Sequence, residues 1–299
     1  MLSILIPVYK TDVVTLVNQL YQQLDSLKIT FEILVWDDGS GEPWTSVNKN
    51  IERLPNTKYH RSPTNQGRAL TRNLLAQSAR HQYLLFLDAD VALIRDDFIS
   101  TYLLNLQNDP SQKVFSGSCI YPSNSPSNPK ELLHWKYGVV VENPGIKKRK
   151  AHPYSHFHTV NFLVPRNVYL EHPMESSLKK YGHEDSLWAM QLKHFHIPII
   201  PLDNPVLHKG LHPNKVFLRH QVAAVRNLLQ INRRGIFLAG NLQKCIVWIQ
   251  KLKIQKPLLF LYKKSERRTI QNLQGNDPNL SNLSWFKIGI ALRFLDKES

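Results

Sequence analysis

The first 90 residues alternate between continuous apolar runs and segments with helical periodicity. Apolar runs at residues 2–8, 31–36 and 83–87 predict strands that are buried on both faces. Apolar residues recur at helical spacing between Val13 and Leu27, and residues 67–79 predict a second helix. Strands that alternate with helices form parallel sheets with right-handed crossovers. The sequence therefore predicts an α/β fold in which ligands bind at the carboxyl ends of the strands.

The alternation weakens in the second half of the chain. Residues 184–194 predict a helix, residues 197–202 a strand, and residues 213–232 a longer helix. Beyond Gly240 the chain consists of short amphipathic segments, one of them at residues 257–262. A chain of 299 residues with 42% hydrophobic residues is long enough for one large α/β domain with an appendage.

Basic residues are concentrated near the carboxyl end. The chain has 38 Lys and Arg against 23 Asp and Glu, and residues 233–299 contain 13 basic and 4 acidic residues, a net charge of +9. We expect a catalytic domain at residues 1–235 and a basic, amphipathic helical extension at residues 236–299. The extension suits either an anionic membrane surface or a helical cap whose charges stay in water. A second basic run, at residues 147–150, predicts an exposed loop.

Several classes of protein are disfavoured by composition. Two cysteines are too few for a disulfide framework, and no apolar run approaches the roughly 18 residues that a membrane span needs. Residues 2–8 lack a preceding basic segment and predict a strand rather than a signal peptide. Because no zinc-finger spacing or aromatic-rich module accompanies the basic charge, we expect no nucleic-acid partner. We expect a cytoplasmic protein, soluble or peripheral on the inner face of the membrane.

Two carboxylates, Asp88 and Asp90, follow the apolar run at residues 83–87. A carboxylate at the end of an apolar strand is costly unless something compensates its charge. At the ligand-binding edge of a parallel sheet, two such groups suit an oxygen-ligated cation such as Mg²⁺ or Mn²⁺. The alternative is a turn before the next helix, and these residues alone leave both interpretations open.

Polar and aromatic residues also follow the first two strands. Asp38 can accept a hydrogen bond from the imide N–H of a base, or it can form an Asx-turn. Tyr9, which follows Pro7 at the end of the first strand, can stack on a base or be a half-buried turn residue.

Charged residues at two predicted helix starts and one strand end complete the candidates. Arg68 and Arg72 lie one helical turn apart and suit a diphosphate, a base carbonyl or a solvated helix face. Glu184 and Asp185 are candidates for a general base, or they are acidic residues in the first turn of a helix. His208 follows a strand-like segment at residues 199–207 and is a candidate metal ligand, although a single histidine is more often structural.

Taken in order, these motifs resemble the inverting glycosyltransferases of family 2, which have the GT-A fold. The resemblance covers residues 2–232 and is carried by LSILIPVY, EILVWDDGS, NQGRALTRN, YLLFLDADV, GHEDSLWAMQL and NPVLHKGLH. It is strongest to bacterial enzymes that build cell-surface polysaccharide and lipopolysaccharide. It implies a Rossmann-like, mostly parallel central sheet flanked by helices, with a C-terminal helical appendage.

The resemblance also implies a role for each candidate residue. The nucleotide-sugar site would consist of residues at the strand ends and on the following helix: Pro7, Tyr9, Asp38, Arg68, Arg72 and Asp88. A divalent metal, Mn²⁺ or Mg²⁺, would be held by Asp90, supported by Asp88, with His208 as a third ligand. Asp185 would be the catalytic base, and Glu184 would contact the donor or the acceptor. Trp188 would lie under the acceptor sugar, and Val160 stands where the family usually has a small residue.

The expected activity is metal-dependent transfer of a sugar from a nucleotide-sugar, with a UDP-sugar as donor. The acceptor would be a hydroxyl of a glycan or a lipid-linked saccharide, and the anomeric centre would be inverted. A nucleotidyltransferase or a nicotinamide dehydrogenase is disfavoured because no glycine-rich turn follows the first strand. A non-catalytic nucleotide-sugar binder and a basic nucleic-acid-binding protein are the remaining alternatives.

Overall fold

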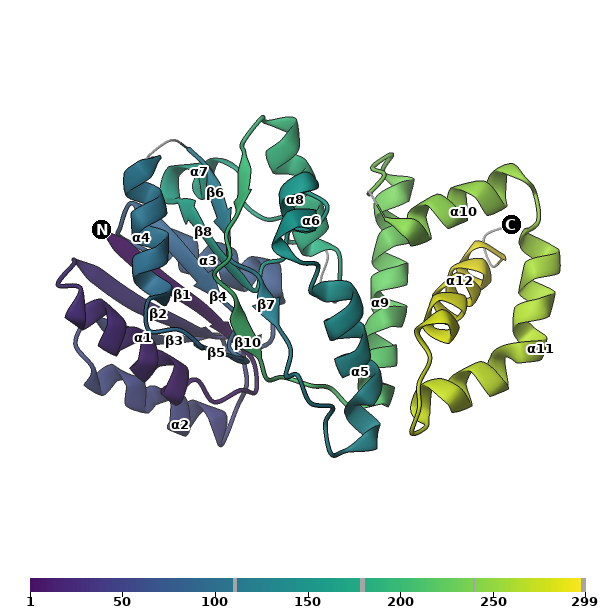
Figure 1. Cartoon of the computed structure of the whole chain (residues 1–299), viewed down its shortest axis with the longest axis horizontal. Coiled ribbons are helices and arrows are strands. Elements are labelled where there is room, and N and C mark those ends of the chain that lie inside the picture. The colour runs from purple at the N-terminus through teal and green to yellow at the C-terminus, as the bar shows by residue number, and fades with distance from the viewer. Residues whose placement is uncertain (110–111, 178–180, 239, 297–299) are drawn as a thin grey trace. The chain divides into compact units, whose positions relative to one another are not determined.

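The computed structural model describes residues 1–109, 112–177, 181–238 and 240–296 (Figure 1). The chain forms two compact units, one of residues 1–121, 143–179 and 184–210 and the other of residues 122–142, 180–183 and 211–299. Residues 211–235 thus group with the C-terminal helices, whereas the sequence places them in the catalytic domain. The domain boundary at residues 235 and 236 stays a prediction.

The first unit is built on a mostly parallel sheet with strand order β3-β2-β1-β4-β8-β6-β9. Its strands are β1 (Leu2–Val8), β2 (Phe31–Asp37), β3 (Thr57–Arg61), β4 (Tyr83–Leu87), β6 (Val114–Ser116), β8 (Asn161–Pro165) and β9 (Ile199–Pro201). The four N-terminal strands run parallel to one another, while β8 is antiparallel to both β4 and β6. The carboxyl ends of β1, β2 and β4 therefore meet at one edge, as the alternation of strands and helices predicts.

A small second sheet lies in the same unit and matters for the candidate site. It consists of β5 (Val91–Ala92), β10 (Val206–His208) and β7 (Cys119–Ile120), in that order. The sequence predicts one strand-like segment from Ile199 to Leu207, but the structure divides it between β9 and β10 in different sheets. The break is at buried Asn204, whose amide donates a hydrogen bond to the carbonyl of Phe98 at 3.0 Å.

Helices cover both faces of the large sheet, as predicted. They are α1 (Val14–Ser26), α2 (Trp44–Lys49), a 3₁₀ helix (Asn50–Arg53), α3 (Arg68–Ser78), α4 (Phe98–Asn108), α6 (Ile146–Ala151), α7 (Arg166–Glu171) and α8 (Glu184–His194). Side chains of α3, α7 and α8 pack with Phe86 and Phe162 in one buried cluster. Figure 1 shows α1 and α4 beside each other on the other face.

The basic run at residues 147–150 is not the exposed loop that its charge predicts. It lies in α6, where Arg149 is buried. The Arg149 guanidinium donates to the carbonyls of Ser116 and Leu202 at 3.2 and 2.8 Å. Burial lowers the pKa of Arg149. The prediction is wrong at this residue because a charged group can be buried where carbonyl oxygens replace its water.

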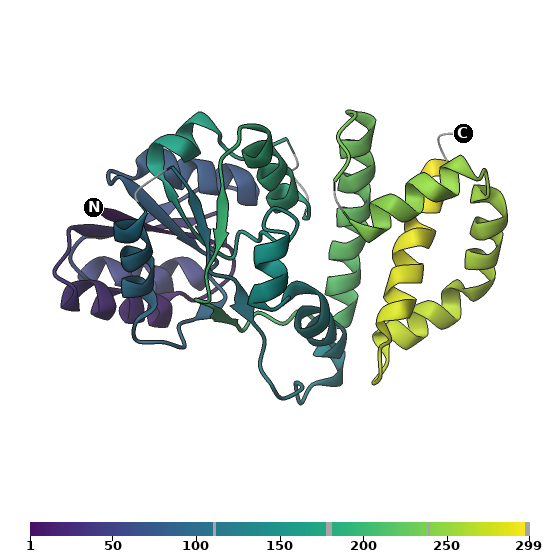
Figure 2. The same ribbon diagram turned by 45° about the horizontal axis from the view of Figure 1, so that its top comes forward.

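The second unit is helical (Figure 2). It contains a 3₁₀ helix (Pro129–Glu131), α5 (Leu132–Tyr137), a π-helix (Gly138–Glu142), α9 (Asn214–Arg233), α10 (Asn241–Lys251), α11 (Gln255–Gln274) and α12 (Leu280–Asp296). Phe217 of α9, Leu273 of α11 and Phe286 of α12 share one buried cluster. Gly289 lies against the ring of Tyr262, so closely that a Cβ atom would overlap it. The predicted C-terminal helices are confirmed, and α11 extends well beyond the segment at residues 257–262. Within the described residues, no helix combines the length and the apolar character needed to cross a bilayer.

Candidate active site

Asp38 lies directly after β2, at the edge where the parallel strands end. Its carboxylate accepts hydrogen bonds from the backbone N–H groups of Gln66 at 2.7 Å and Gly67 at 2.9 Å, and the residue is only 4% exposed. These bonds fix the turn that leads into α3, where Gly67 has a φ of 97°. Two carboxylate oxygens can accept further bonds, so the contact between Asp38 and a base stays a prediction.

Tyr9 and Pro7 lie at the end of the neighbouring strand β1. Tyr9 is 47% exposed, and the ammonium group of Lys10 lies 5.1 Å from the centroid of its ring. Pro7 is half-buried and pairs with Trp36 across the β1–β2 register. The structure therefore places an exposed aromatic ring beside the strand end that carries Asp38.

Asp37, the last residue of β2, has a structural role. It is fully buried and accepts hydrogen bonds from the Tyr59 hydroxyl and, at 2.7 Å, from the backbone N–H of Ser40. Burial and this bond to Asp37 raise the pKa of Tyr59, so the hydroxyl keeps its proton and remains a donor.

Arg72 and Asp88 form an ion pair between α3 and the end of β4. The guanidinium Nη2 lies 2.6 Å from Asp88 Oδ1, and the Arg72 side chain is 2% exposed. Its Nε and Nη1 atoms are buried and have no hydrogen-bond partner within the described part of the chain. The backbone N–H of Asp88 donates to the carbonyl of Val160 at 3.0 Å. Arg72 is thus no solvated helix residue, and its two unpartnered donors are enclosed beside the end of β4.

Asp90 and His208 face each other across the small sheet. Because β5 and β10 pair antiparallel with Val91 opposite His208, the imidazole Nε2 lies 3.7 Å from Asp90 Oδ2. The ring of Tyr121 stacks on His208 with a centroid distance of 5.1 Å. Gly210 lies so close to Asp90 that a Cβ atom there would overlap the carboxylate. Packing therefore fixes the carboxylate oxygen of Asp90 beside the imidazole nitrogen of His208.

These two side chains fit a divalent cation that takes its other ligands from a substrate or water. Within residues 1–109, 112–177, 181–238 and 240–296, no group of three His, Cys, Asp or Glu side chains gathers around a common point. Asp88, the other predicted ligand, is bound to Arg72. A carboxylate with an imidazole suits Mn²⁺, and Mg²⁺ commonly uses only one or two protein carboxylates.

The first turn of α8 carries Glu184 and Asp185. Glu184 Oε1 lies 3.8 Å from Arg68 Nη1, which joins the starts of α3 and α8. Asp185 Oδ1 accepts the N–H of Ser186 at 2.6 Å, and Asp185 Oδ2 lies 3.3 Å from His158 Nδ1. His158 is not among the residues that the sequence motifs predict for the site. The two residues are 27 positions apart, and no local pattern connects them.

The predicted role of Trp188 is wrong. Its side chain is 1% exposed and packs against Phe157, Phe162 and Tyr169 in the main core. The indole N–H donates to the carbonyl of His172 at 2.7 Å. A ring enclosed in this way has no free face for an acceptor sugar, so Trp188 stabilises α8 instead.

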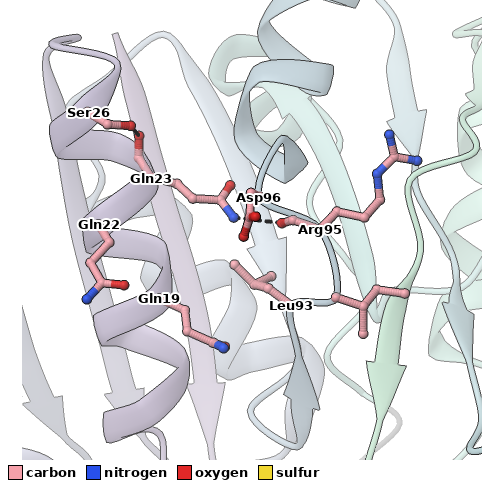
Figure 3. A pocket seen from close by; sticks show the side chains of 8 residues that line it. Gln19, Gln22, Gln23, Ser26, Leu93, Arg95 and Asp96 are labelled. Atoms are coloured by element: carbon pink, nitrogen blue, oxygen red, sulfur yellow. Dashed lines mark hydrogen bonds between the residues drawn. The ribbon is translucent and has the colours of Figure 1, made fainter.

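A pocket of about 460 Å³ lies elsewhere in the first unit (Figure 3). Its lining residues, none of them a predicted site residue, are Gln19, Gln22, Gln23, Ser26, Leu93, Ile94, Arg95 and Asp96. The amide of Gln23 donates to the carbonyl of Arg95 at 2.8 Å and accepts the N–H of Ile99 at 3.0 Å. These bonds join α1 to the start of α4, and we interpret the pocket as a structural one.

Comparison with known proteins identifies a family and a fold. The family described as Glycosyl transferase family 2 matches residues 3–172. An uncharacterized glycosyltransferase from Haemophilus influenzae is 30% identical over 115 residues, which are 36% of this chain and 43% of the relative. The match thus spans less than half the length of that relative.

Solved structures show the same fold. A mannosyltransferase from Pyrobaculum calidifontis aligns over 100% of this chain and 88% of its own, with a TM-score of 0.56 and 15% identity. Glucosyl-3-phosphoglycerate synthase from Mycobacterium tuberculosis aligns over 80% of this chain and 82% of its own, with a TM-score of 0.52 and 13% identity. Since the family match covers more than half of the sequence, the chain belongs to glycosyl transferase family 2, and it has the GT-A fold.

Proposed function

We propose that the chain transfers a sugar from a nucleotide-sugar, with a UDP-sugar as donor, to an acceptor hydroxyl with inversion at the anomeric carbon. The observation that carries the proposal is the Asp90–His208 pair, 3.7 Å apart at the edge where the strands end. Two proteins of the same fold support it: the mannosyltransferase was crystallised with GDP-Man and Mn²⁺, and the synthase with UDP and Mn²⁺.

Asp90 and His208 would hold the cation, and Asp88 would support this site through its ion pair with Arg72. When bound, Mn²⁺ or Mg²⁺ neutralises the negative charge that develops on the departing diphosphate. Arg72, whose Nε and Nη1 donors lack a hydrogen-bond partner among the described residues, would lie near the diphosphate or the base. Its positive charge would stabilise the leaving group from a buried setting, where electrostatic interactions are stronger than in water.

The nucleoside would be held by the ends of β1 and β2. The exposed Tyr9 ring would stack on the base, with Pro7 beside it, and Asp38 would accept the imide N–H. Arg68, which is half exposed, would contact the donor from the start of α3. An Asp38 carboxylate fixed by two backbone N–H groups would keep a constant position for base recognition.

Asp185 would accept the proton of the acceptor hydroxyl as its oxygen attacks the anomeric carbon opposite the leaving diphosphate. One displacement of this kind inverts the anomeric centre. His158 would position the Asp185 carboxylate through their 3.3 Å contact, and Glu184 would contact the donor or the acceptor. Fixing the base in this way lowers the entropic cost of reaching the transition state.

We further propose that the acceptor is a growing glycan or a lipid-linked saccharide in bacterial cell-surface polysaccharide synthesis. The reaction would take place in the cytoplasm or at the inner face of the membrane. The resemblance of the motifs to surface-polysaccharide enzymes supports this class of acceptor.

The proposal is tested by measuring thermal unfolding of the full chain with UDP-, GDP- and dTDP-sugars, with and without Mn²⁺. We expect a UDP-sugar to raise the unfolding midpoint in Mn²⁺ and to lose this effect in EDTA. Slow donor hydrolysis, followed by NMR, should release a sugar of inverted anomeric configuration. Equal stabilisation by all donors with and without metal would contradict the proposal.

A further inference from the structure

Large apolar side chains are exposed on one part of the helical unit. They lie on α10, on the turn that follows it, and on the first half of α11, and their exposed fractions range from 36% to 61%. We call this set the α10–α11 surface: Val247, Trp248, Leu252, Ile254, Phe260 and Leu261. In Figure 1, α10 and α11 meet at a corner, so residues of the turn lie between the two helices. The exposed apolar residues therefore lie close together along the chain, on two consecutive helices and the turn between them.

The α10–α11 surface is separate from the faces by which these helices pack. Ile246 and Ile249 of α10 are buried, as are Leu259 and Tyr262 of α11. Both helices thus have one apolar side that belongs to the core and a second apolar side that faces solvent. Exposed apolar groups gathered in this way mark interaction sites.

Lysines are interleaved with these apolar residues. Six exposed lysines lie between residues 241 and 264, and we include them in the α10–α11 surface: Lys244, Lys251, Lys253, Lys256, Lys263 and Lys264. The ammonium groups of Lys251 and Lys264 lie 5.7 and 4.4 Å from the ring centroids of Trp248 and Phe260. The sequence from residue 235 to residue 265 contains no Asp or Glu. The surface is therefore both apolar and positively charged, and its partner must be complementary in both respects.

This composition favours a lipid surface over a macromolecule. Protein interfaces are enriched in Arg and depleted in Lys, whereas residues 241–264 contain six Lys and no Arg. A nucleic acid would leave the aliphatic side chains of Leu252, Ile254 and Leu261 without a partner. At a bilayer, lysines reach the phosphate groups while Trp and aliphatic side chains enter the boundary between headgroups and acyl chains.

We propose that the α10–α11 surface docks the enzyme on membranes rich in anionic phospholipid, without crossing them. Trp248, Leu252 and Phe260 enter the interface, and Lys251, Lys253 and Lys256 bind the lipid phosphates. The inference rests on this surface alone and is independent of the donor and the metal. It gives the enzyme access to lipid-linked acceptors.

The test is binding of the full chain to vesicles of phosphatidylcholine alone or with 30% phosphatidylglycerol, measured by flotation in 0.1 M salt without donor. We expect at least tenfold tighter binding to the anionic vesicles, because each Lys near such a surface contributes about a fivefold change in affinity. Trp248→Ser, Leu252→Ser and Phe260→Ser combined should lower the affinity at least tenfold. Lys251→Gln, Lys253→Gln and Lys256→Gln combined should lower it by about 10- to 100-fold.

Matched controls separate the surface from general effects of charge and hydrophobicity. Lys49→Gln, Lys58→Gln and Lys193→Gln combined remove three exposed lysines from the first unit and should leave binding within twofold. Leu104→Ser removes an equally exposed leucine from α4 and should likewise have no effect. Donor-induced thermal stabilisation, measured without vesicles, shows whether each variant is folded and tests the nucleotide site separately.

Three results would overturn the proposal. The first is equal binding, or none, to the two kinds of vesicle. The second is unchanged affinity in the glutamine variant, which decides the question even if the serine variant fails to fold. The third is a dimer that the serine substitutions dissociate, or retention on DNA, in a chain that does not float with anionic vesicles.

Discussion

The strand-end edge of the sheet and the α10–α11 surface are both rich in charged residues, but they use charge in opposite ways. At the sheet edge, charges of opposite sign meet as Arg72 with Asp88 and Arg68 with Glu184, and backbone N–H groups fix Asp38. On the α10–α11 surface, charge of one sign is exposed among apolar side chains. Internal pairing fixes a site in advance for a small ligand. Exposed charge of one sign attracts a large surface of the opposite sign.

Removing the proposed base should have the largest effect at the sheet edge. Asp185→Asn keeps the shape of the side chain but cannot accept the acceptor proton, so transfer should fall by about 10³-fold, within the range for general bases. Transfer is measured in single turnovers at saturating donor. Asp25→Asn, an exposed carboxylate on α1, is the control and should retain full activity. A rate near that of the native protein, with unchanged donor stabilisation, would remove Asp185 from the mechanism.

Breaking the buried Arg72–Asp88 pair should lower the free energy of unfolding much more than breaking an exposed ion pair. Arg72→Met leaves Asp88 without its cation, and we expect a loss of about 3 kcal/mol in the free energy of unfolding. Arg95→Met breaks the exposed pair with Asp97, whose oxygen lies 2.7 Å from the guanidinium, and should cost less than about 1 kcal/mol. Urea unfolding measures both. Equal losses would mean that burial does not distinguish the two pairs.

Lys287 is a lysine of the helical unit that points inward, unlike those of the α10–α11 surface. It donates to the Tyr137 hydroxyl at 3.4 Å, and burial lowers its pKa to about 8 despite the opposing effect of Glu142. The pKa of a lysine in the unfolded chain is about 10.4. At pH values between about 8 and this value, Lys287 holds a proton in the unfolded state that it has lost in the folded state. The free energy of unfolding should therefore rise with pH in this window.

Lys287→Met should remove this rise, which we expect to amount to about 2 kcal/mol between pH 8 and pH 10. Urea unfolding at both pH values gives the difference. Lys263→Met, on the exposed side of α11, should keep the pH dependence of the native protein. If the two variants respond alike, Lys287 is not the titrating group.

The close approach of Gly210 to Asp90 allows a test of Asp90 as a metal ligand, with a smaller expected effect. In Gly210→Ala the new methyl group would displace the Asp90 carboxylate, so we expect Mn²⁺ to be bound about tenfold more weakly, or about 1.4 kcal/mol. The metal concentration needed for donor-induced stabilisation measures this. Gly145→Ala, where a Cβ atom meets nothing within 4 Å, is the matched control. Unchanged metal dependence in Gly210→Ala would exclude Asp90 as a ligand.

The smallest expected effect concerns His158. His158→Ala should lower transfer about fivefold, because Asp185 loses a neighbour that orients it. His158→Asn keeps a polar side chain and should recover part of the rate, with donor binding unchanged in both variants. Equal losses in the two variants would indicate a general structural role instead.

Sequence patterns determined the elements whose signals are local. The strand at residues 83–87 and the helix at residues 184–194 have the predicted bounds, because an apolar run and an acidic first turn are complete within each segment. The mostly parallel sheet follows from the alternation of such elements. Local patterns also identified the polar residues at the strand ends, including Asp38, Asp88 and Asp90.

Only the tertiary structure decided which of these residues meet. Asp90 reaches His208 because β5 pairs with β10, and Asp185 reaches His158 because α8 begins beside the residues before β8. It also decided which side chains are enclosed. Trp188 lies in the core, although its neighbours in sequence predicted a place in the active site. Arg149 is buried against carbonyl oxygens, although the basic run around it predicted an exposed loop. Periodicity depends only on the segment to which a residue belongs, whereas contacts and burial depend on segments far away in the chain.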